Sequence, residues 1–562
     1  MIGVGLSAGD QSARRPAAMP TGQAPFLRSP PFPGIAPSVG AISVDQYAPE
    51  PAQPVPDAVF DAIASARVGG TFWGQRLDPA PLLVRAGCSV PPDLLARYSP
   101  GRLLRLPAAG QGTQPRGPLC FDPWWLVARA QAVCAPLDDE LALVAGLLGV
   151  PMFDSAAAPV APDRLRAALG ARIAAARYRD CFTGEPVDVA DAVAQLADWR
   201  RHIDGNRGIV AASGMAFWKR EAMAHFLWDG DRSPPFLSAG RGLRRAAHGR
   251  GALAIWPSRV PASAIADAAA RAVPIARVED GFLRSRGLGA GLHPPGSVVV
   301  DRSGIYYNAR AVSDLEQLLA THEFPPALVE RATRLRARIC ATGVTKYGPE
   351  AGHMIDLPAG RRTVLAIGQV DDDQSVRLGG AGIDGNLDFL ARVRRAERDA
   401  WILYRPHPDV QAGHRKGHLS DAQVLAHADA IDRGGAPLME LVQAVDEVHV
   451  LSSLTGFEAL MRGCRVTVHG MPFYAGWGLT RDLAKPNGRR GRRLALDQLV
   501  AAALILYPRY LDPVTRLPCG PEIMVDRMTA GAAPAVNWLI RLRALQGKLR
   551  RLMTLSAEFL HG

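Results

Sequence analysis

From about residue 160 onward, short apolar runs alternate with polar turns and amphipathic stretches. This repeated strand–turn–helix order is typical of parallel sheets covered by helices on both faces. The runs fall into two groups, so the sequence predicts two doubly wound, Rossmann-type α/β domains, residues 161–345 and 346–510, facing a cleft. The predicted strands are 208–212, 252–256 and 275–278 with a hairpin over 298–307, then 363–367, 401–404, 448–451 and 465–469.

The two ends of the chain lack this rhythm. Residues 1–60 are rich in Pro, Ala, Gly and Ser and predict a disordered tail. Residues 61–160 have apolar segments but no repeat, so we expect an appended region whose fold the sequence leaves open. Residues 511–562 predict a basic amphipathic helical segment, which either lies on an anionic membrane surface or packs across the domain pair.

Cysteine usage and hydropathy narrow the class of protein. The seven cysteines are scattered and never form a C-x-x-C pair, which argues against a disulfide framework or a zinc site. Residues 1–23 lack an apolar signal sequence, and no apolar run is long enough to span a bilayer. We therefore expect a cytoplasmic protein.

The formal net charge of +12 favours an anionic partner, such as a nucleotide, an acidic sugar or an anionic lipid. The densest basic run, residues 489–493, follows a Pro-Asn-Gly turn and predicts a solvated loop. No aromatic residues that could stack on bases are interleaved with it, so nucleic acid is not an expected partner.

A serine-rich turn in the second domain predicts a phosphate site. An apolar strand leads through Ser452, Ser453 and Thr455 directly into a helix. Unpaired N–H groups and the positive dipole end of such a helix bind anions, the hydroxyls add donors, and Gly456 permits close approach. The alternative is a capping box, Thr455-x-x-Glu458, that starts the helix without a ligand.

Charged side chains gather where a strand of the first domain ends. Glu279 and Asp280 follow an apolar run, and Arg284 stands four residues after Asp280. Reactive groups of α/β enzymes lie at such strand ends, and strand geometry would point the two carboxylates to opposite sides. The alternative is an ion pair with Arg277 or Arg284 that only fixes the loop.

His407 lies between two prolines just past a strand of the second domain, so its imidazole is presented in a fixed direction. We interpret it as a phosphate ligand that stabilises a departing phosphate. The acidic run 371–373 follows a turn at Gly368-Gln369 and is either a metal clamp or turn decoration.

These segments belong to a set of five ordered motifs. The set resembles that of the capsule polysaccharide β-Kdo transferases of the KpsC type over about residues 200–525. Asp371 stands where that family has Glu, Arg405 stands where it often has Lys, and one motif set occurs where members commonly carry two modules. The motifs are Val278-Glu-Asp-Gly-Phe-Leu-Arg-Ser285 with Gly287-Leu-Gly289, Gly368-Gln-Val370 with Asp372-Asp373, Pro406-His-Pro-Asp-Val410, Ser453-Leu-Thr-Gly-Phe-Glu-Ala-Leu460 and Pro472-Phe-Tyr-Ala-Gly-Trp-Gly-Leu-Thr480.

The resemblance implies a GT-B retaining glycosyltransferase that moves Kdo from CMP-β-Kdo onto a β-Kdo acceptor, carried on a lipid at the cytoplasmic face of the inner membrane. It implies Asp280 as the nucleophile of a double displacement. Our hypothesis for Arg284 is that it relieves repulsion between Asp280 and the Kdo carboxylate, whereas Glu279 is either an acid/base group or a loop-positioning residue. The donor nucleotide is expected at His407, Arg405, Ser452, Ser453, Thr455, Gly456, Gln369 and Glu458.

No metal or other cofactor is expected, because CMP-Kdo has a single phosphate and no pyrophosphate for a divalent ion to bridge. The expected partners are CMP-Kdo and a Kdo-terminated glycolipid, with an anionic membrane surface and capsule assembly proteins as further candidates. Two alternatives stay open: a transferase for another CMP-linked ulosonic acid, and a non-catalytic polysaccharide assembly factor.

Overall fold

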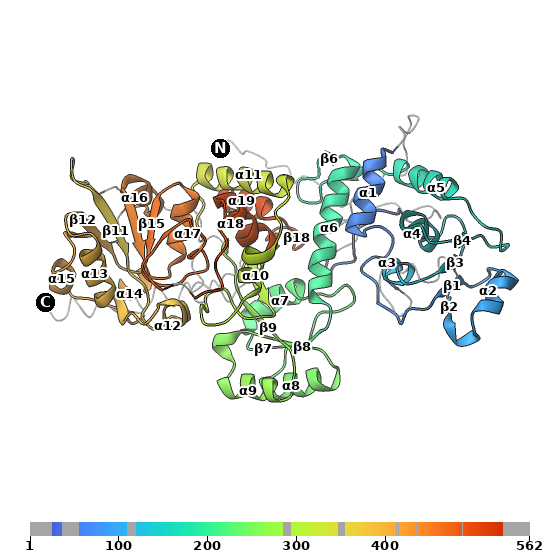
Figure 1. The fold of residues 1–562 in the computed structure, drawn as a ribbon, viewed down its shortest axis with the longest axis horizontal. Coiled ribbons are helices and arrows are strands. Elements are labelled where there is room, and N and C mark those ends of the chain that lie inside the picture. Colours follow the sequence, from blue (N-terminus) through green and yellow to red (C-terminus); the bar gives the residue numbers. More distant parts are fainter. Residues whose placement is uncertain are drawn as a thin grey trace, which may run out of the picture. The chain divides into compact units, whose positions relative to one another are not determined.

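In this computed structural model the chain contains three β-sheets with helices around them and one short β-hairpin (Figure 1). The structure describes residues 25–35, 55–108, 120–284, 294–346, 355–411, 413, 415–433, 436–485 and 487–531. The part up to Arg201 forms one compact unit, and the part from His202 forms a second unit that holds two of the sheets. The predicted α/β class with parallel strands is confirmed.

The first unit contains a parallel sheet of order β2-β1-β3-β4. The sequence left this region open because its strands span only two to four residues, too few for a clear apolar run. The strands are β1 (Leu82–Arg85), β2 (Leu103–Leu106), β3 (Ala132–Cys134) and β4 (Met152–Phe153), with the hairpin β5 (Tyr178–Arg179) and β6 (Pro186–Val187). The helices are α1 (Asp57–Ala66), α2 (Pro92–Arg97), α3 (Pro123–Val127), α4 (Glu140–Leu148), α5 (Pro162–Ala174) and α6 (Val189–Asn206).

Part of the predicted disordered tail is packed into this unit, so that prediction is wrong for residues 25–35. Phe26, Leu27 and Phe32 are buried. The ring of Phe26 lies so close to Gly69 that a Cβ there would be 2.2 Å from it, and Phe32 meets Trp199 edge to face at 5.1 Å. Burial of these three large apolar side chains therefore provides enough free energy to order a Pro-rich segment whose average hydrophobicity is low.

The boundary predicted at residue 160 also lies too early, since the first unit extends to Arg201. Helix α5 packs directly on α4, where a Cβ at Gly146 would be 2.8 Å from the Cβ of Leu165. The glycine permits this close approach, which ties residues after 160 to the preceding sheet.

The first sheet of the second unit has the order β18-β17-β10-β9-β8-β7, with β7, β8 and β9 parallel and the others antiparallel. The predicted hairpin over 298–307 is not formed. Its first half, β10, pairs with β9 and β17, and the carboxylate of Asp301 then accepts the N–H groups of Ser303 and Gly304 to turn the chain. The strands are β7 (Ile209–Ser213), β8 (Ala252–Ile255), β9 (Ile275–Asp280), β10 (Ser297–Asp301), β17 (Pro508–Leu511) and β18 (Pro518–Cys519).

Helices around this sheet include the C-terminal α19, which lies beside α11 (Figure 1). Since β17, β18 and α19 return to the first sheet, the boundary predicted at residue 510 divides a sheet strand and is corrected to the start of β17. The predicted amphipathic helix around residues 538–552 lies outside the described residues. The helices are α7 (Arg220–Phe226), α8 (Ala239–His248), α9 (Ala262–Ala270), α10 (Asp314–Thr321), α11 (Pro326–Thr342) and α19 (Pro521–Thr529).

The other sheet is parallel throughout, in the order β13-β12-β11-β14-β15-β16. Its four longest strands match the predicted ones within a residue. The strands are β11 (Thr363–Ile367), β12 (Trp401–Arg405), β13 (Ala430–Ile431), β14 (Glu447–Val450), β15 (Arg465–Val468) and β16 (Arg481–Asp482). The helices are α12 (Gln374–Gly379), α13 (Gly385–Ala396), α14 (Pro408–Gln411), α15 (Asp421–Leu425), α16 (Leu438–Ala444), α17 (Leu454–Met461) and α18 (Leu496–Val500).

One hydrophobic core joins the two sheets of the second unit. At its centre three motif phenylalanines meet: Phe282 stacks on Phe473 at 4.7 Å, and Phe457 lies 5.3 Å from Phe473. Phe282 follows β9, whereas Phe457 belongs to α17, so the core fixes the end of one sheet against a helix of the other. None of the described helices combines the length and apolarity needed to cross a bilayer.

The basic run at 489–493 is not the solvated loop that the sequence predicts. The carboxylate of Glu316 on α10 binds Arg489 at 2.5 Å and Arg490 at 2.9 Å. Arg490 is buried and also donates to the carbonyls of Pro472 and Ala475. Only half of a capping box forms at the start of α10, because the Ser313 hydroxyl accepts the Glu316 N–H but the Glu316 side chain turns to the arginines.

We expect Glu316→Gln to lower the free energy of unfolding by about 3–5 kcal/mol, because it leaves the Arg490 guanidinium buried without its carboxylate. Urea unfolding followed by tryptophan fluorescence measures this change. The matched control is Glu330→Gln, which removes the partner of Arg334 in a pair that is 65% and 71% exposed and should change the free energy by less than about 1 kcal/mol. Equal effects of the two substitutions would contradict the structural role of the buried pair.

Candidate functional site

A small pocket of about 170 Å³ lies where the parallel strands β7, β8 and β9 end. Asp280 is the last residue of β9, Trp256 directly follows β8, and Lys219 follows β7 in the short helical turn Phe217–Lys219. The carboxyl edge of a parallel sheet is where α/β proteins place ligands. The pocket is lined by Ala216, Trp218, Lys219, Trp256, Arg259, Asp280 and Arg284.

Each oxygen of the Asp280 carboxylate has its own cation. Lys219 Nζ lies 3.0 Å from Oδ1, and Arg284 Nε lies 2.8 Å from Oδ2. Burial alone would raise the pKa of Asp280, but the charges of Arg284 and Lys219 outweigh it and hold that pKa below its usual range. Asp280 is therefore an ionised carboxylate on a pocket wall.

Glu279 has the opposite environment, although it is the neighbouring residue on β9. Burial and the negative charge of Asp280 raise its pKa to about 7, and its carboxylate accepts the Asp280 backbone N–H at 3.1 Å. Asp280 lines the pocket and Glu279 does not, as expected when side chains alternate along a strand. Two adjacent acids thus have clearly different proton affinities near neutral pH.

Lys219 is one of the pocket residues that the sequence did not predict. Its Nζ lies over the ring of Trp256 at 3.4 Å and near that of Trp218 at 5.2 Å, so two indoles and Asp280 fix the ammonium group. The place of Lys219 and Trp256 in the sequence was the one indication of a role in the site. The two residues follow two predicted parallel strands, as Asp280 follows a third. No recognisable motif surrounds them, so position alone did not mark them as site residues.

Gln369 and Ser452 follow the neighbouring strands β11 and β14 and are hydrogen-bonded to each other. Gln369 Oε1 accepts the Ser452 N–H at 2.7 Å, and Gln369 Nε2 donates to Ser452 Oγ at 3.2 Å. Asn386 in turn accepts the Gln369 N–H. The side chain of Gln369 therefore holds the serine-rich turn in place.

The start of α17 differs in detail from the predicted capping box. The N-cap is Ser453, whose hydroxyl oxygen accepts the Thr455 N–H, so Thr455 lies within the first turn. Glu458 does not return to the cap but accepts the backbone N–H of Lys346 at 2.9 Å. Gly456 gives room to Tyr474, whose hydroxyl oxygen would lie 2.3 Å from a Cβ at that position.

His407 and Arg405 lie at the end of β12 but face different surroundings. Nδ1 of His407 accepts the Asp409 N–H at 3.1 Å, which places the proton of the neutral ring on Nε2, and burial lowers its pKa. The Arg405 guanidinium is buried, donating to Asp432 at 2.8 Å and to the Ala436 carbonyl. Its contacts in the structure are therefore with the protein, and His407 is the more accessible of the two.

The backbone of Lys346 connects the two groups of candidate residues. Its carbonyl accepts the Arg284 N–H at 3.1 Å, and its N–H donates to Glu458 of α17. The charge of Lys346 acts on Asp280 and also on His407. The sequence offered no motif at Lys346, and residues 285–289 of the first motif lie outside the described part of the chain.

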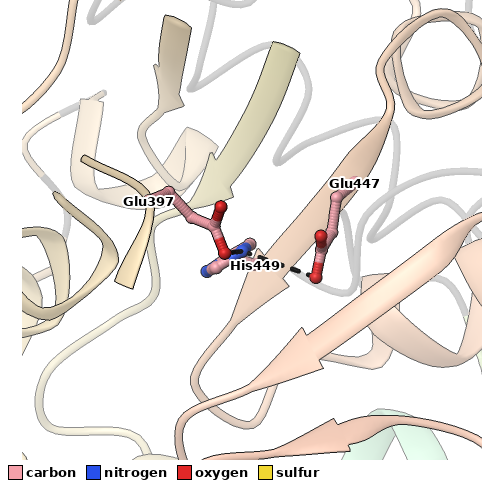
Figure 2. A group of neighbouring side chains, drawn as sticks. All are labelled: Glu397, Glu447 and His449. Carbon is pink, nitrogen blue, oxygen red and sulfur yellow. Dashed lines mark ion pairs between the residues drawn. The ribbon is translucent and has the colours of Figure 1, made fainter. Parts of the chain in front are cut away.

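A second polar cluster lies at the opposite, amino edge of the β11–β16 sheet (Figure 2). His449 Nε2 is buried 3.6 Å from a carboxylate oxygen of Glu397 and 3.6 Å from one of Glu447, and it makes no hydrogen bond within the described residues. One imidazole nitrogen and two carboxylates are a possible ligand set for a divalent metal.

The surroundings of this cluster do not favour a cation. Arg362 binds one oxygen of each glutamate, and Arg481 binds Glu397 at 2.7 Å. Two carboxylates are thus offset by two guanidinium groups. We interpret the cluster as an internally compensated ion network whose imidazole stays neutral.

The site can now be compared with known proteins. Residues 251–510 match the family described as capsule polysaccharide biosynthesis protein, in agreement with the resemblance that the five motifs indicate. It is 39% identical over 339 residues to capsule polysaccharide modification protein LipA of Neisseria meningitidis serogroup A, covering 60% of this chain and 48% of LipA. It is 45% identical over 244 residues to lipopolysaccharide-processing protein LpsZ of Rhizobium meliloti, covering 42% of this chain and 54% of LpsZ.

The chain therefore spans about half the length of these curated relatives. Two solved structures of Thermosulfurimonas dismutans KpsC, described as a β-Kdo 2,7 transferase and a β-Kdo 2,4 transferase, are also similar. They share 30% and 33% identity with it, cover 57% of this chain and 99% and 98% of their own, and have TM-scores of 0.47 and 0.49.

The ion network at the amino edge generates a pH prediction. Burial lowers the pKa of His449 from its ordinary 6.5 to about 4, so the unfolded chain binds this proton more readily. The stability contributed by the neutral ring is present above pH 6.5 and is lost as the pH falls towards 4. The loss amounts to about 3 kcal/mol.

We expect His449→Asn, which keeps a group able to bond His469, to flatten the decrease in melting temperature between pH 6.5 and 4. Thermal unfolding across that range measures the slope. His248→Asn, at an exposed position on α8, is the control and should leave the slope unchanged. If both variants retain the wild-type slope, the neutral buried imidazole is not its source.

Proposed function

We propose that the protein is a GT-B-type retaining glycosyltransferase that transfers Kdo from CMP-β-Kdo to a β-Kdo acceptor on a glycolipid during capsule polysaccharide assembly. The family match supports the pathway, and the β-Kdo transfer named for the related KpsC proteins supports the sugar. The observation that carries the proposal is Asp280, an ionised carboxylate at a strand end, held by two cations on the wall of a pocket.

The first displacement uses Asp280 as the nucleophile. An Asp280 oxygen bonds to C2 of Kdo while the bond from C2 to the phosphate oxygen breaks, and the electron pair leaves with CMP. The low pKa of Asp280 keeps it ionised without a base. The leaving phosphate is already an anion, so this step requires no proton.

In the second displacement an acceptor hydroxyl attacks C2 and the bond to Asp280 breaks, which restores the original configuration. The hydroxyl proton must pass to a base. Glu279 is the adjacent acid whose pKa of about 7 lies near neutral pH, but it does not line the pocket, so it either accepts this proton indirectly or only positions the strand end. Burial is the main cause of this raised pKa and the Asp280 charge the second, so esterification of Asp280 removes the second cause and lowers the pKa of Glu279.

We assign the CMP phosphate to the carboxyl edge of the other sheet. The Nε2 proton of His407, the hydroxyls of Ser452 and Thr455 and the start of α17 offer donors there. Gln369, Ser453, Gly456 and Glu458 hold this edge together, and Arg405 supports it from within the protein. A glycolipid acceptor places the working enzyme at the cytoplasmic face of the inner membrane, with capsule assembly proteins as neighbours.

Asp280→Asn should lower CMP release from CMP-Kdo and a β-Kdo acceptor by about a thousandfold or more, since the nucleophile is lost. Mass spectrometry of wild-type enzyme incubated with donor alone should find one Kdo residue attached at Asp280. Asp267→Asn, an exposed acid on α9, is the control and should keep full activity. An active Asp280→Asn enzyme, or an adduct on another residue, contradicts the assignment, and turnover of only another CMP-ulosonic acid favours a different donor.

We further propose that the reaction needs no divalent metal, because a single phosphate can be stabilised by His407 and the helix start. Transfer rates should be the same within about twofold in EDTA and in Mg²⁺ or Mn²⁺. Loss of activity in EDTA that returns with one added metal would overturn this proposal. It would not affect the role of Asp280.

A further inference from the structure

The pocket at Asp280 carries more positive than negative charge. Lys219, Arg259 and Arg284 line it as cations and Asp280 is its single lining acid, so three positive charges face one negative charge and the formal sum is +2. Trp218 and Trp256 supply apolar surface beside these charges. An anionic sugar matches such a wall better than a neutral one, because indoles pack on sugar C–H groups and cations bind a carboxylate.

The two cations at Asp280 are held differently. The Arg284 side chain is 2% exposed, and the backbone of that residue is bonded to Lys346 and Gly296, so its guanidinium is fixed. Lys219 has a flexible stem and one ion-pair contact with Asp280 at 3.0 Å, and the rings of Trp256 and Trp218 hold its ammonium group without a directional hydrogen bond. An ammonium group can turn to a new acceptor with a small rotation, whereas the guanidinium keeps its direction.

We propose that Lys219 passes its ion pair from Asp280 to the carboxylate of the transferred ulosonic acid, and that this exchange makes the pocket selective for acidic sugars. The inference rests on the proposed function, since it assigns a role during formation of the Asp280–sugar bond. That bond consumes the negative charge of Asp280 and would leave Lys219, a largely buried cation, without its ion-pair partner at 3.0 Å. The carboxylate of the ulosonic acid is attached to the same carbon as the new ester, so it replaces the lost charge.

Asp280→Asn tests this exchange without catalysis, because a neutral amide imitates the charge of the esterified residue. The probes are the β-methyl glycoside of Kdo as its carboxylate and as its methyl ester, with binding measured by isothermal titration calorimetry. We expect Asp280→Asn to prefer the carboxylate over the ester about tenfold more strongly than the wild-type enzyme does. Adding Lys219→Met to Asp280→Asn should abolish this gain in preference for the carboxylate, whereas adding Lys219→Arg should retain part of the gain.

Two further variants keep the test decisive. Arg220→Gln in the Asp280→Asn background removes a cation next to Lys219 that does not line the pocket, and it should leave the gain unchanged. Arg259→Gln in the same background removes an exposed cation that lines the pocket, and it should reduce the preference for the carboxylate over the ester. This measurement remains available if the Lys219→Met protein is unstable. Equal binding of carboxylate and ester by Asp280→Asn, or an undiminished gain without Lys219, overturns the inference. CMP release by the wild-type enzyme is measured separately, so failure of the proposed transferase activity is a distinct result.

Discussion

An aromatic stack and a chain of hydrogen bonds attach the segment from Asp280 to Arg284 to residues that surround the β11–β16 sheet. The candidate site depends on this attachment. Phe282 stacks on Phe473, and the Arg284 N–H donates to the Lys346 carbonyl. The Lys346 N–H then donates to Glu458 on α17. Because these contacts are buried and directional, the acid at the end of β9 and the helix start after β14 belong to one bonded frame.

Within that frame, the two adjacent acids are separated by their environments. Asp280 faces two cations and stays ionised, whereas Glu279 is buried beside the Asp280 charge and holds its proton up to about pH 7. Strand alternation gives the two side chains different surroundings, and the cations at Asp280 and the burial of Glu279 then set their pKa values apart. One strand end therefore presents an ionised acid to the pocket and a second acid, which titrates near neutral pH, outside the pocket lining.

The sequence could predict those parts of the site that depend on local pattern. The ends of β9, β11, β12 and β14 follow from apolar runs, and they place Asp280, Gln369, His407 and Ser452 correctly at carboxyl edges. Lys219 and Lys346 escaped prediction because their partners are distant in the chain and no motif marks them. For the same reason Arg490 appeared solvated, although Glu316, more than 170 residues earlier, buries it.

The β11–β16 sheet has polar side chains at both edges, and charge compensation distinguishes the edges. At the amino edge, two glutamates meet two arginines around a neutral His449, and each charge has a partner within the protein. At the carboxyl edge, His407 is 39% exposed and its Nδ1 accepts a backbone N–H, which leaves the Nε2 proton for another acceptor. Helix α17 also begins at this edge, with positive dipole character. A compensated network contributes to stability, whereas donors at the carboxyl edge would contribute binding free energy for an anion, and we therefore propose that edge for the phosphate.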